Sequence, residues 1–164
     1  MITLIRKSRL SIGDLKKELK RMLNEASASP KVRQLALEIT GSHDTHNSIG
    51  SIYTWVKDNV RYIPDPMGSE GEIELFISPI RMTNDYYQGK ALGGDCDDIA
   101  LMTASLSQSI GIPSKIILID TAGEGIDHAV AELWSEKLAT WVMCDPSSKF
   151  PPGWQEKYYQ RIEV

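Results

Sequence analysis

The sequence predicts an α+β fold in which N-terminal helices and a central cysteine-bearing helix pack on an antiparallel β-sheet. Apolar residues recur at helical spacing in three N-terminal segments and again directly after Cys96. Three strand-like runs follow the central helix, joined by loops short enough for antiparallel hairpins. The N-terminal helical segments cover residues 12–26, 30–40 and 49–59, and the strand-like runs cover residues 114–120, 127–134 and 139–145.

Length and composition favour a single domain over residues 1–164. The chain is 41% hydrophobic, enough for a core, and we divide it into a helical part (about 1–60), a core (about 60–146) and a tail (147–164). The net charge of −4 is spread along the chain, so we expect no nucleic-acid partner. No run is long enough for a membrane span or a secretory signal, so we expect a cytoplasmic protein with no membrane partner.

The three N-terminal helices have recognisable ends. Ser29 and Pro30 suit the N-cap and first position of the second helix, and Gly41 suits its C-terminal stop. The third helix should end near Asn59. The linker between the second and third helices contains His43, Asp44 and His46, which could hold a metal, although no further ligand pattern follows.

The segment from residue 60 to residue 94 gives a weak pattern. Residues 60–63 form a short extended run, and Ile73 to Ile77 resembles a strand. Proline and glycine interrupt the rest. A connection of this length usually builds a binding surface, so we expect it to form one wall of a cleft in front of Cys96.

The residues around Cys96 organise the chain. A glycine turn at Gly93 and Gly94 precedes Cys96, and the apolar spacing from Ile99 onward indicates a helix that stops at Gly111. Cys96 would then lie in the first turn and face inward. Unpaired N–H groups and the helix dipole favour a thiolate there. Core packing of a buried cysteine is the alternative.

Strand register predicts partners for Cys96. If Ser135 to Leu138 form a four-residue hairpin loop, Trp134 lies opposite Ala139, and the ladder then places His128 opposite Asp145. A slip of one residue would turn Asp145 to the other face. A cysteine helix on this sheet would create a Cys–His–Asp arrangement.

Each of these residues then has a chemical role. Cys96 would be the nucleophile, His128 the base and later the acid, and Asp145 the group that orients the imidazole. The backbone N–H of Cys96 is a natural oxyanion donor. Such a set supports acyl transfer through a thioester.

Other interpretations of these residues stay open. His128 could be a hydrogen-bonded strand histidine, and Asp145 before Pro146 could be a turn signal. Cys96, His128 and Asp145 could ligate zinc, although a structural site needs a fourth ligand. Three acidic residues could bind calcium but lack the alternating spacing of such loops. These are Asp95, Asp97 and Asp98.

Together these stretches resemble the transglutaminase-like superfamily of papain-type cysteine enzymes. The matching stretches run from Gly94 to Asp98, from Gly111 to Pro113, from His128 to Trp134 and from Trp141 to Pro146. The resemblance implies that Cys96, His128 and Asp145 form the catalytic triad. We expect no cofactor and no metal. The run from Val60 to Pro66 is similar to small bacteriophage and prophage members.

The chain departs from that pattern at two positions. The superfamily often has an aromatic residue where this chain has Val130. Many members place a tryptophan or glutamine before the cysteine as a second oxyanion donor, and no tryptophan lies between Tyr62 and Cys96. Gln88 is the remaining candidate for that donor.

We therefore expect a cysteine protease or amidase that acts on a protein or peptide, with virion or host proteins as substrates. A cross-linking transglutaminase and a non-catalytic phage assembly module that keeps the fold are the alternatives. An N-acetyltransferase would need a coenzyme A site, and no glycine loop followed by a basic residue suggests one.

Overall fold

The computed structural model describes residues 2–5, 10–41, 45–69 and 71–164. The helices are α1 (Ile12–Ser27), α2 (Pro30–Thr40), α3 (Thr45–Asn59), α4 (Pro79–Tyr87) and α5 (Cys96–Ser109). The first strands are β1 (Ile2–Ile5), β2 (Val60–Tyr62), β3 (Met67–Gly68), β4 (Gly71–Glu72) and β5 (Glu74–Ile77). The remaining strands are β6 (Leu92–Gly94), β7 (Ser114–Asp120), β8 (His128–Ser135), β9 (Thr140–Cys144) and β10 (Gln160–Glu163).

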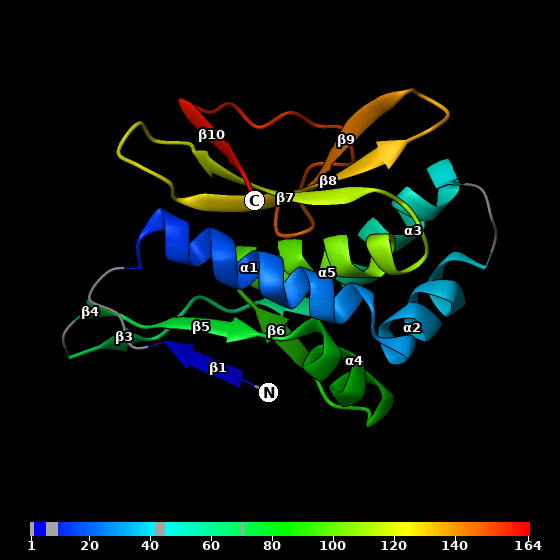
Figure 1. Ribbon diagram of the computed structural model, residues 1–164, viewed down its shortest axis with the longest axis horizontal. Coiled ribbons are helices and arrows are strands. Elements are labelled where there is room, and N and C mark those ends of the chain that lie inside the picture. The colour runs from blue at the N-terminus through cyan, green and yellow to red at the C-terminus, as the bar shows by residue number, and fades with distance from the viewer. Residues whose placement is uncertain (1, 6–9, 42–44, 70) are drawn as a thin grey trace.

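The elements form three layers, with the helices in the middle (Figure 1). An antiparallel sheet in the order β10-β7-β8-β9 covers one side of α1 and α5. The short pairs β1-β5 and β2-β6 lie on the other side together with α4. The α+β class and the packing of the cysteine helix on an antiparallel sheet are confirmed.

Helix α5 is buried around most of its circumference. Every residue from Asp97 to Ser107 is buried, including the hydroxyl-bearing ones. Thr103 donates to the carbonyl of Ile99 at 2.8 Å, and Ser107 donates to the carbonyl of Thr103 at 2.9 Å. These bonds back to the preceding turn satisfy hydroxyls that would otherwise be unfavourable in the core.

The N-terminal helices follow the sequence prediction closely. Helix α1 begins after Ser11, whose hydroxyl accepts from the backbone N–H of Asp14 at 3.1 Å. Helix α2 has Ser29 at its N-cap and Pro30 at its first position, and Gly41 ends it with a left-handed φ of 57°. Helix α3 ends at Asn59 as predicted.

The interpretation of residues 64–94 was wrong in part. Helix α4 occupies a stretch that we treated as irregular because Pro79 looked like an interruption. Pro79 instead begins the helix, and the Ser78 hydroxyl caps it by accepting from the N–H of Ile80 at 3.2 Å. Strand β5 lies within the predicted strand, but its partner β1 was not predicted.

The C-terminal tail is held mainly by backbone pairing. Trp154, Tyr158 and Tyr159 do not anchor it by burial, because Tyr159 is 78% exposed and the other two residues are at least two-fifths exposed. Trp154 stacks on Phe150 with ring centroids 4.3 Å apart. Strand β10 pairs with the edge strand β7, a pairing that we did not predict.

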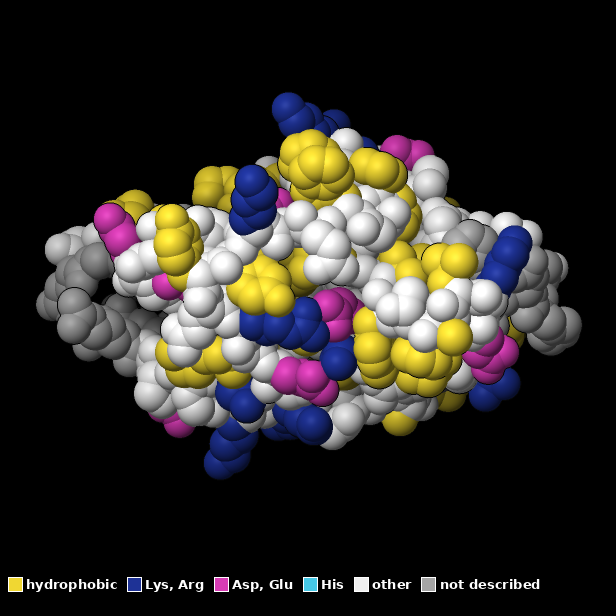
Figure 2. Space-filling view, turned by 90° about the horizontal axis from the view of Figure 1, so that it is seen from above, with side chains coloured by type: hydrophobic (Ala, Val, Ile, Leu, Met, Phe, Trp, Pro, Cys, Tyr) yellow, Lys and Arg dark blue, Asp and Glu magenta, His cyan; other side chains and the backbone are white. Residues whose placement is uncertain are grey.

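The outer face of the large sheet carries a charged network. Arg161 of β10 donates to both carboxylate oxygens of Glu132, at 2.5 and 2.7 Å, and Glu132 is 4% exposed. Figure 2 views this face and shows acidic and basic side chains gathered between apolar ones. Helices long and apolar enough to cross a membrane do not occur in the described part of the chain.

Candidate active site

Strand β6 delivers Cys96 to the start of α5. We predicted a turn at Gly93 and Gly94, and this was wrong. Both residues belong to β6, which runs parallel to β2 with Tyr62 paired to Gly94. Gly94 allows the close approach of β6 to α5, because an added Cβ there would lie 2.6 Å from the Cβ of the buried Asp98. At Gly93 an added Cβ would meet the end of the exposed Ile63 side chain, which can move away.

Cys96 and His128 line the same cavity. Its volume is about 260 Å³, and its walls come from the start of α5, the start of β8, the segment after β2 and the first residue of β5. The loop between β2 and β5 therefore contributes a wall, as the sequence predicted. The thiol of Cys96 hydrogen-bonds to the imidazole of His128.

His128 is held by Asp145 from the other side of its ring. The Nε2 atom lies 2.7 Å from Oδ2 of Asp145. The other carboxylate oxygen of Asp145 accepts from the backbone N–H of Ser147 at 3.1 Å and from its hydroxyl at 2.5 Å. Since Nε2 faces Asp145, Nδ1 is the nitrogen left for Cys96.

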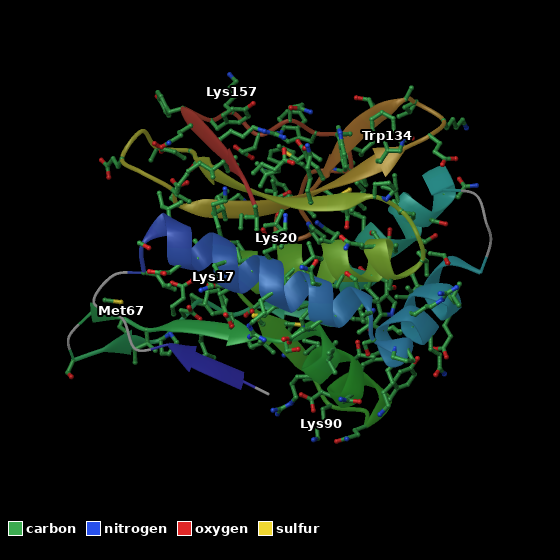
Figure 3. All side chains as sticks on the ribbon, viewed as in Figure 1. Lys17, Lys20, Met67, Lys90, Trp134 and Lys157 are labelled. Atoms are coloured by element: carbon green, nitrogen blue, oxygen red, sulfur yellow. The ribbon has the colours of Figure 1, made fainter. Side chains whose placement is uncertain are left out.

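The register that we used to predict this pair was wrong by two residues. Trp134 pairs with Trp141 rather than Ala139, and Ala131 pairs with Cys144. Because the shift is an even number, Asp145 stays on the same face as His128, as its diagonal rather than its direct neighbour. Figure 3 labels Trp134, near the end of β8 opposite to His128.

The surroundings of the pair change the pKa values of both groups. Burial lowers the pKa of His128, but the hydrogen bonds to Asp145 and Cys96 outweigh it and raise the pKa to about 10. Burial raises the pKa of Asp145, and the bonds from His128 and Ser147 reverse that effect and hold it below its usual value. At neutral pH the pair is therefore an imidazolium and a carboxylate.

Cys144, unlike Cys96, is a core residue. It is fully buried in the core on the α5 side of the sheet, and burial with the nearby negative charges of Asp145 and Glu132 raises its pKa to about 12. Both cysteines are free thiols. Cys144 therefore has neither the access nor the ionisation of a nucleophile.

The structure does not bring Gln88 to the cavity. Gln88 is the exposed C-cap residue of α4 and does not line the cavity, so we do not assign it to an oxyanion site. Tyr62 lines the cavity instead, and no local sequence pattern indicates this because its position depends on the parallel pairing of β2 with β6. Burial and the negative charges of Cys96 and Asp95 raise the pKa of its phenol, so the hydroxyl stays protonated.

Three carboxylates lie together behind Cys96. One oxygen from each of Asp95, Asp97 and Asp98 lies within 4.8 Å of the others, which could hold a metal ion despite their unusual sequence spacing. Asp98 accepts from the N–H of Ile77 at 2.7 Å, and burial raises its pKa to about 8. His43 and Asp44, and the side chain of His46, lie outside the described residues.

The fold and this grouping define a class of protein. A cysteine at the start of a helix meets, in one cavity, a histidine held by an aspartate that directly follows the neighbouring strand of an antiparallel sheet. Residues 33–146 match the model of the transglutaminase-like superfamily. The chain belongs to this superfamily.

Solved structures with the same fold include two bacterial proteins described as candidate proteases. One is a candidate cysteine protease from Cytophaga hutchinsonii, with a TM-score of 0.55 and 20% identity over 84% of this chain and 45% of that one. The other, from Parabacteroides distasonis, has a TM-score of 0.58 and 15% identity over 82% of this chain and 26% of that one. This chain therefore spans less than half the length of either protein.

LapG from Legionella pneumophila is similar over more of its own length. The TM-score is 0.51 with 16% identity, over 81% of this chain and 75% of LapG. At these identities the likeness shows the fold. A sequence comparison with curated proteins matches none.

Proposed function

We propose that this protein is a thiol-dependent acyl-transfer enzyme that acts on amide bonds of proteins or peptides, with hydrolysis as the main outcome. The observation that supports this most strongly is the hydrogen-bonded chain from Cys96 through His128 to Asp145, whose central imidazole has a pKa of about 10. The membership of the transglutaminase-like superfamily and the protease descriptions of its structural neighbours support the same chemistry.

The reaction follows from the positions of the side chains. Cys96 and His128 act as a thiolate and an imidazolium, with the proton on Nδ1 of His128, and the thiolate sulfur attacks the carbonyl carbon of the amide. The negative charge that forms on the carbonyl oxygen is stabilised by the backbone N–H of Cys96 at the start of α5. His128 then protonates the leaving amine, and a thioester to Cys96 remains.

The second half of the reaction uses the same groups. Water gives a proton to the neutral His128 while its oxygen attacks the thioester carbon, and the acid leaves as the C–S bond breaks, which restores the Cys96 thiolate beside the His128 imidazolium. Asp145 keeps Nε2 engaged through both halves, so that Nδ1 always faces the sulfur. Ser147 in turn keeps the carboxylate of Asp145 in place.

Tyr62 is our candidate for the second oxyanion donor. Its β2 strand pairs with the residue two positions before Cys96, its ring lines the cavity, and its phenol keeps its proton because burial and nearby negative charge raise its pKa. A hydroxyl donor there would replace the tryptophan or glutamine expected from the family pattern.

Acylation by 4-nitrophenyl acetate tests the proposal. We expect an acetyl group on Cys96 in the wild type and no acetylated residue at position 96 in Cys96→Ala, measured by peptide mass spectrometry. Added monodansylcadaverine then separates the two acceptors. Loss of the acetyl group as acetate supports the hydrolase, whereas its transfer to the amine supports the transglutaminase alternative, and an unmodified wild-type Cys96 contradicts both.

Virion or host proteins as substrates, the cytoplasmic location and the single-domain division stay predictions. The non-catalytic module predicts the same fold without acylation of Cys96. The acetyl experiment therefore also decides between that alternative and an enzyme.

A further inference from the structure

The cavity beside Cys96 has a strong excess of acidic side chains. Among the described residues that line it there is neither a lysine nor an arginine, and His128 is the one side chain there able to carry a positive charge. The acidic lining residues are Asp65, Glu74, Asp95, Asp97 and Asp127. A concave site lined by one sign of charge concentrates ions of the opposite sign.

The acidic groups come from separate parts of the chain and meet only in the fold. Asp65 follows β2 and accepts from the N–H of Leu75 at 2.8 Å, while Glu74 begins β5. Asp127 precedes β8 on the opposite wall, where its carboxylate accepts from the N–H and hydroxyl of Thr121 at 2.8 and 2.7 Å. The charge therefore surrounds the cavity rather than marking one acidic stretch.

Asp97 supplies an independent indication of a ligand. Its side chain lines the cavity although the residue is 6% exposed. Burial and side-chain hydrogen bonds with Asp95 and Glu74 raise its pKa, yet its Oδ1 atom has no hydrogen-bond partner among the described residues. A buried carboxyl oxygen without a donor is unfavourable. A positively charged donor from a bound molecule would satisfy it.

We propose that this cavity binds the side chain of a lysine or arginine next to the amide that Cys96 attacks, so that the substrates are basic segments of proteins. The inference rests on the proposed acyl-transfer function. At about 260 Å³ the cavity is slightly smaller than the roughly 300–1,000 Å³ of drug-sized sites. It therefore suits one extended side chain rather than a folded ligand.

Charged thiol reagents measure this preference at Cys96 itself. Methanethiosulfonates form a mixed disulfide with a thiolate and release methanesulfinate. They exist with a trimethylammonium-ethyl group, with a sulfonatoethyl group of similar size, and as the neutral methyl compound. We expect the cationic reagent to modify Cys96 about tenfold faster than the anionic one at low salt, and the ratio to fall as salt is added. A chelator is present throughout, so that divalent cations do not occupy the carboxylates.

A matched pair of variants locates the charge. Glu74→Gln removes one acidic group of the cavity without changing side-chain length, and we expect it to lower the cation-to-anion ratio about threefold. Glu136→Gln makes the same change in the β8–β9 loop, outside the cavity. We expect the Glu136→Gln ratio to equal that of the wild type.

Competing peptides connect the measurement to substrates. Acetylated and amidated tri-lysine should slow the modification of Cys96 by the neutral reagent, whereas tri-glutamate of the same form should not. A cation-to-anion ratio near one, equal effects of both peptides, or equal ratios in the two variants would overturn the inference.

The neutral reagent separates this failure from that of the proposed function. If it modifies Cys96 no faster than Cys144, the proposed nucleophile itself is wrong. If it modifies Cys96 rapidly while charge makes no difference, the acyl-transfer proposal stands and the basic-substrate inference fails.

Discussion

The imidazole of His128 hydrogen-bonds to the carboxylate of Asp145, with 2.7 Å between Nε2 and Oδ2, although the two residues are not opposite each other in the β8–β9 ladder. The contact is diagonal and lies at the end of the sheet where β8 begins and β9 has just ended. Asp145 can turn toward His128 because it has left the ladder, and Ser147 fixes it there. The segment directly after β9, which contains Asp145 and Ser147, therefore sets the position of the Asp145 carboxylate relative to His128.

Replacing Asp145 or Ser147 should lower the rate at which Cys96 is acylated without unfolding the protein. We expect Asp145→Asn to lower the acylation rate of Cys96 by about 10²- to 10⁴-fold, because an amide cannot stabilise the imidazolium or select its tautomer. Ser147→Ala removes the hydrogen bond from the Ser147 hydroxyl to Asp145 and keeps the one from the backbone N–H, so it should cause a smaller loss, about tenfold. Stopped-flow release of 4-nitrophenol measures both.

Ser148→Ala serves as the control for Ser147→Ala. The Ser148 hydroxyl donates to the backbone carbonyl of Asp145 at 2.9 Å and does not bond to its carboxylate. The Ser148→Ala rate should stay close to that of the wild type. Equal losses in the two serine variants would show that the loop as a whole, rather than the bond to the carboxylate, sets the rate.

The protonation of His128 should contribute to stability over a defined pH range. Its folded pKa is about 10 against an ordinary value of 6.5. A raised pKa in the folded state stabilises the protein fully below pH 6.5, and the contribution is lost as pH rises through about 10. Urea unfolding of the wild type and His128→Gln should therefore give free energies that differ most at pH 6.5 or below and converge near pH 10. A difference that grows toward pH 10 would show that His128 is neutral in the fold.

The hydroxyl of Tyr62 should affect the reaction and not the fold. Removing an oxyanion donor typically lowers kcat by about 10²- to 10³-fold, and we expect Tyr62→Phe to lose activity in this direction with little change in KM. Thermal unfolding should be unchanged, since Tyr62 is 55% exposed. Gln88→Ala, at an exposed residue outside the cavity, should leave kcat unchanged. An active Tyr62→Phe enzyme would rule out the donor role.

Gly94 should not tolerate a side chain. A Cβ at Gly94 would lie 2.6 Å from the Cβ of Asp98, one turn into α5. Such overpacking costs about 1–3 kcal/mol, so Gly94→Ala should lower the free energy of unfolding in urea by that amount. Gly50→Ala in α3 is the matched control, because nothing lies within 4 Å of its added Cβ. Gly50→Ala should be neutral or stabilising, as alanine is favoured over glycine in a helix.

The sequence predicted the elements whose signals are local. The spacing of apolar residues gave α1, α2, α3 and α5, and alternation with short loops gave β7, β8 and β9. Pro79 was misinterpreted because proline at a first helical position and proline in a loop look alike unless the preceding Ser78 is recognised as the helix cap. Strands β1 and β10 depend on partners far away in the chain.

The sequence predicted the part of the candidate site that depends only on which face of the sheet a side chain points to. The side-chain direction of His128 and Asp145 is the same under any even shift of register, so the pair remains although the loop length was misjudged. The acidic cavity and the place of Tyr62 were not predictable in this way. They arise where β2, β5 and the start of β8 lie together around Cys96. No local sequence pattern predicts that these distant segments come together.

The alkylation rates of the two cysteines test the central claim, that Cys96 and His128 act as one unit, most directly. Iodoacetamide labelling followed by peptide mass spectrometry gives the rate at Cys96 and at Cys144 in the same sample. We predict that Cys96 reacts far faster than Cys144 in the wild type and slows by at least about tenfold in His128→Gln, while Cys144 is unchanged. Equal rates at the two cysteines in the wild type, or an unchanged Cys96 rate in His128→Gln, would contradict the account.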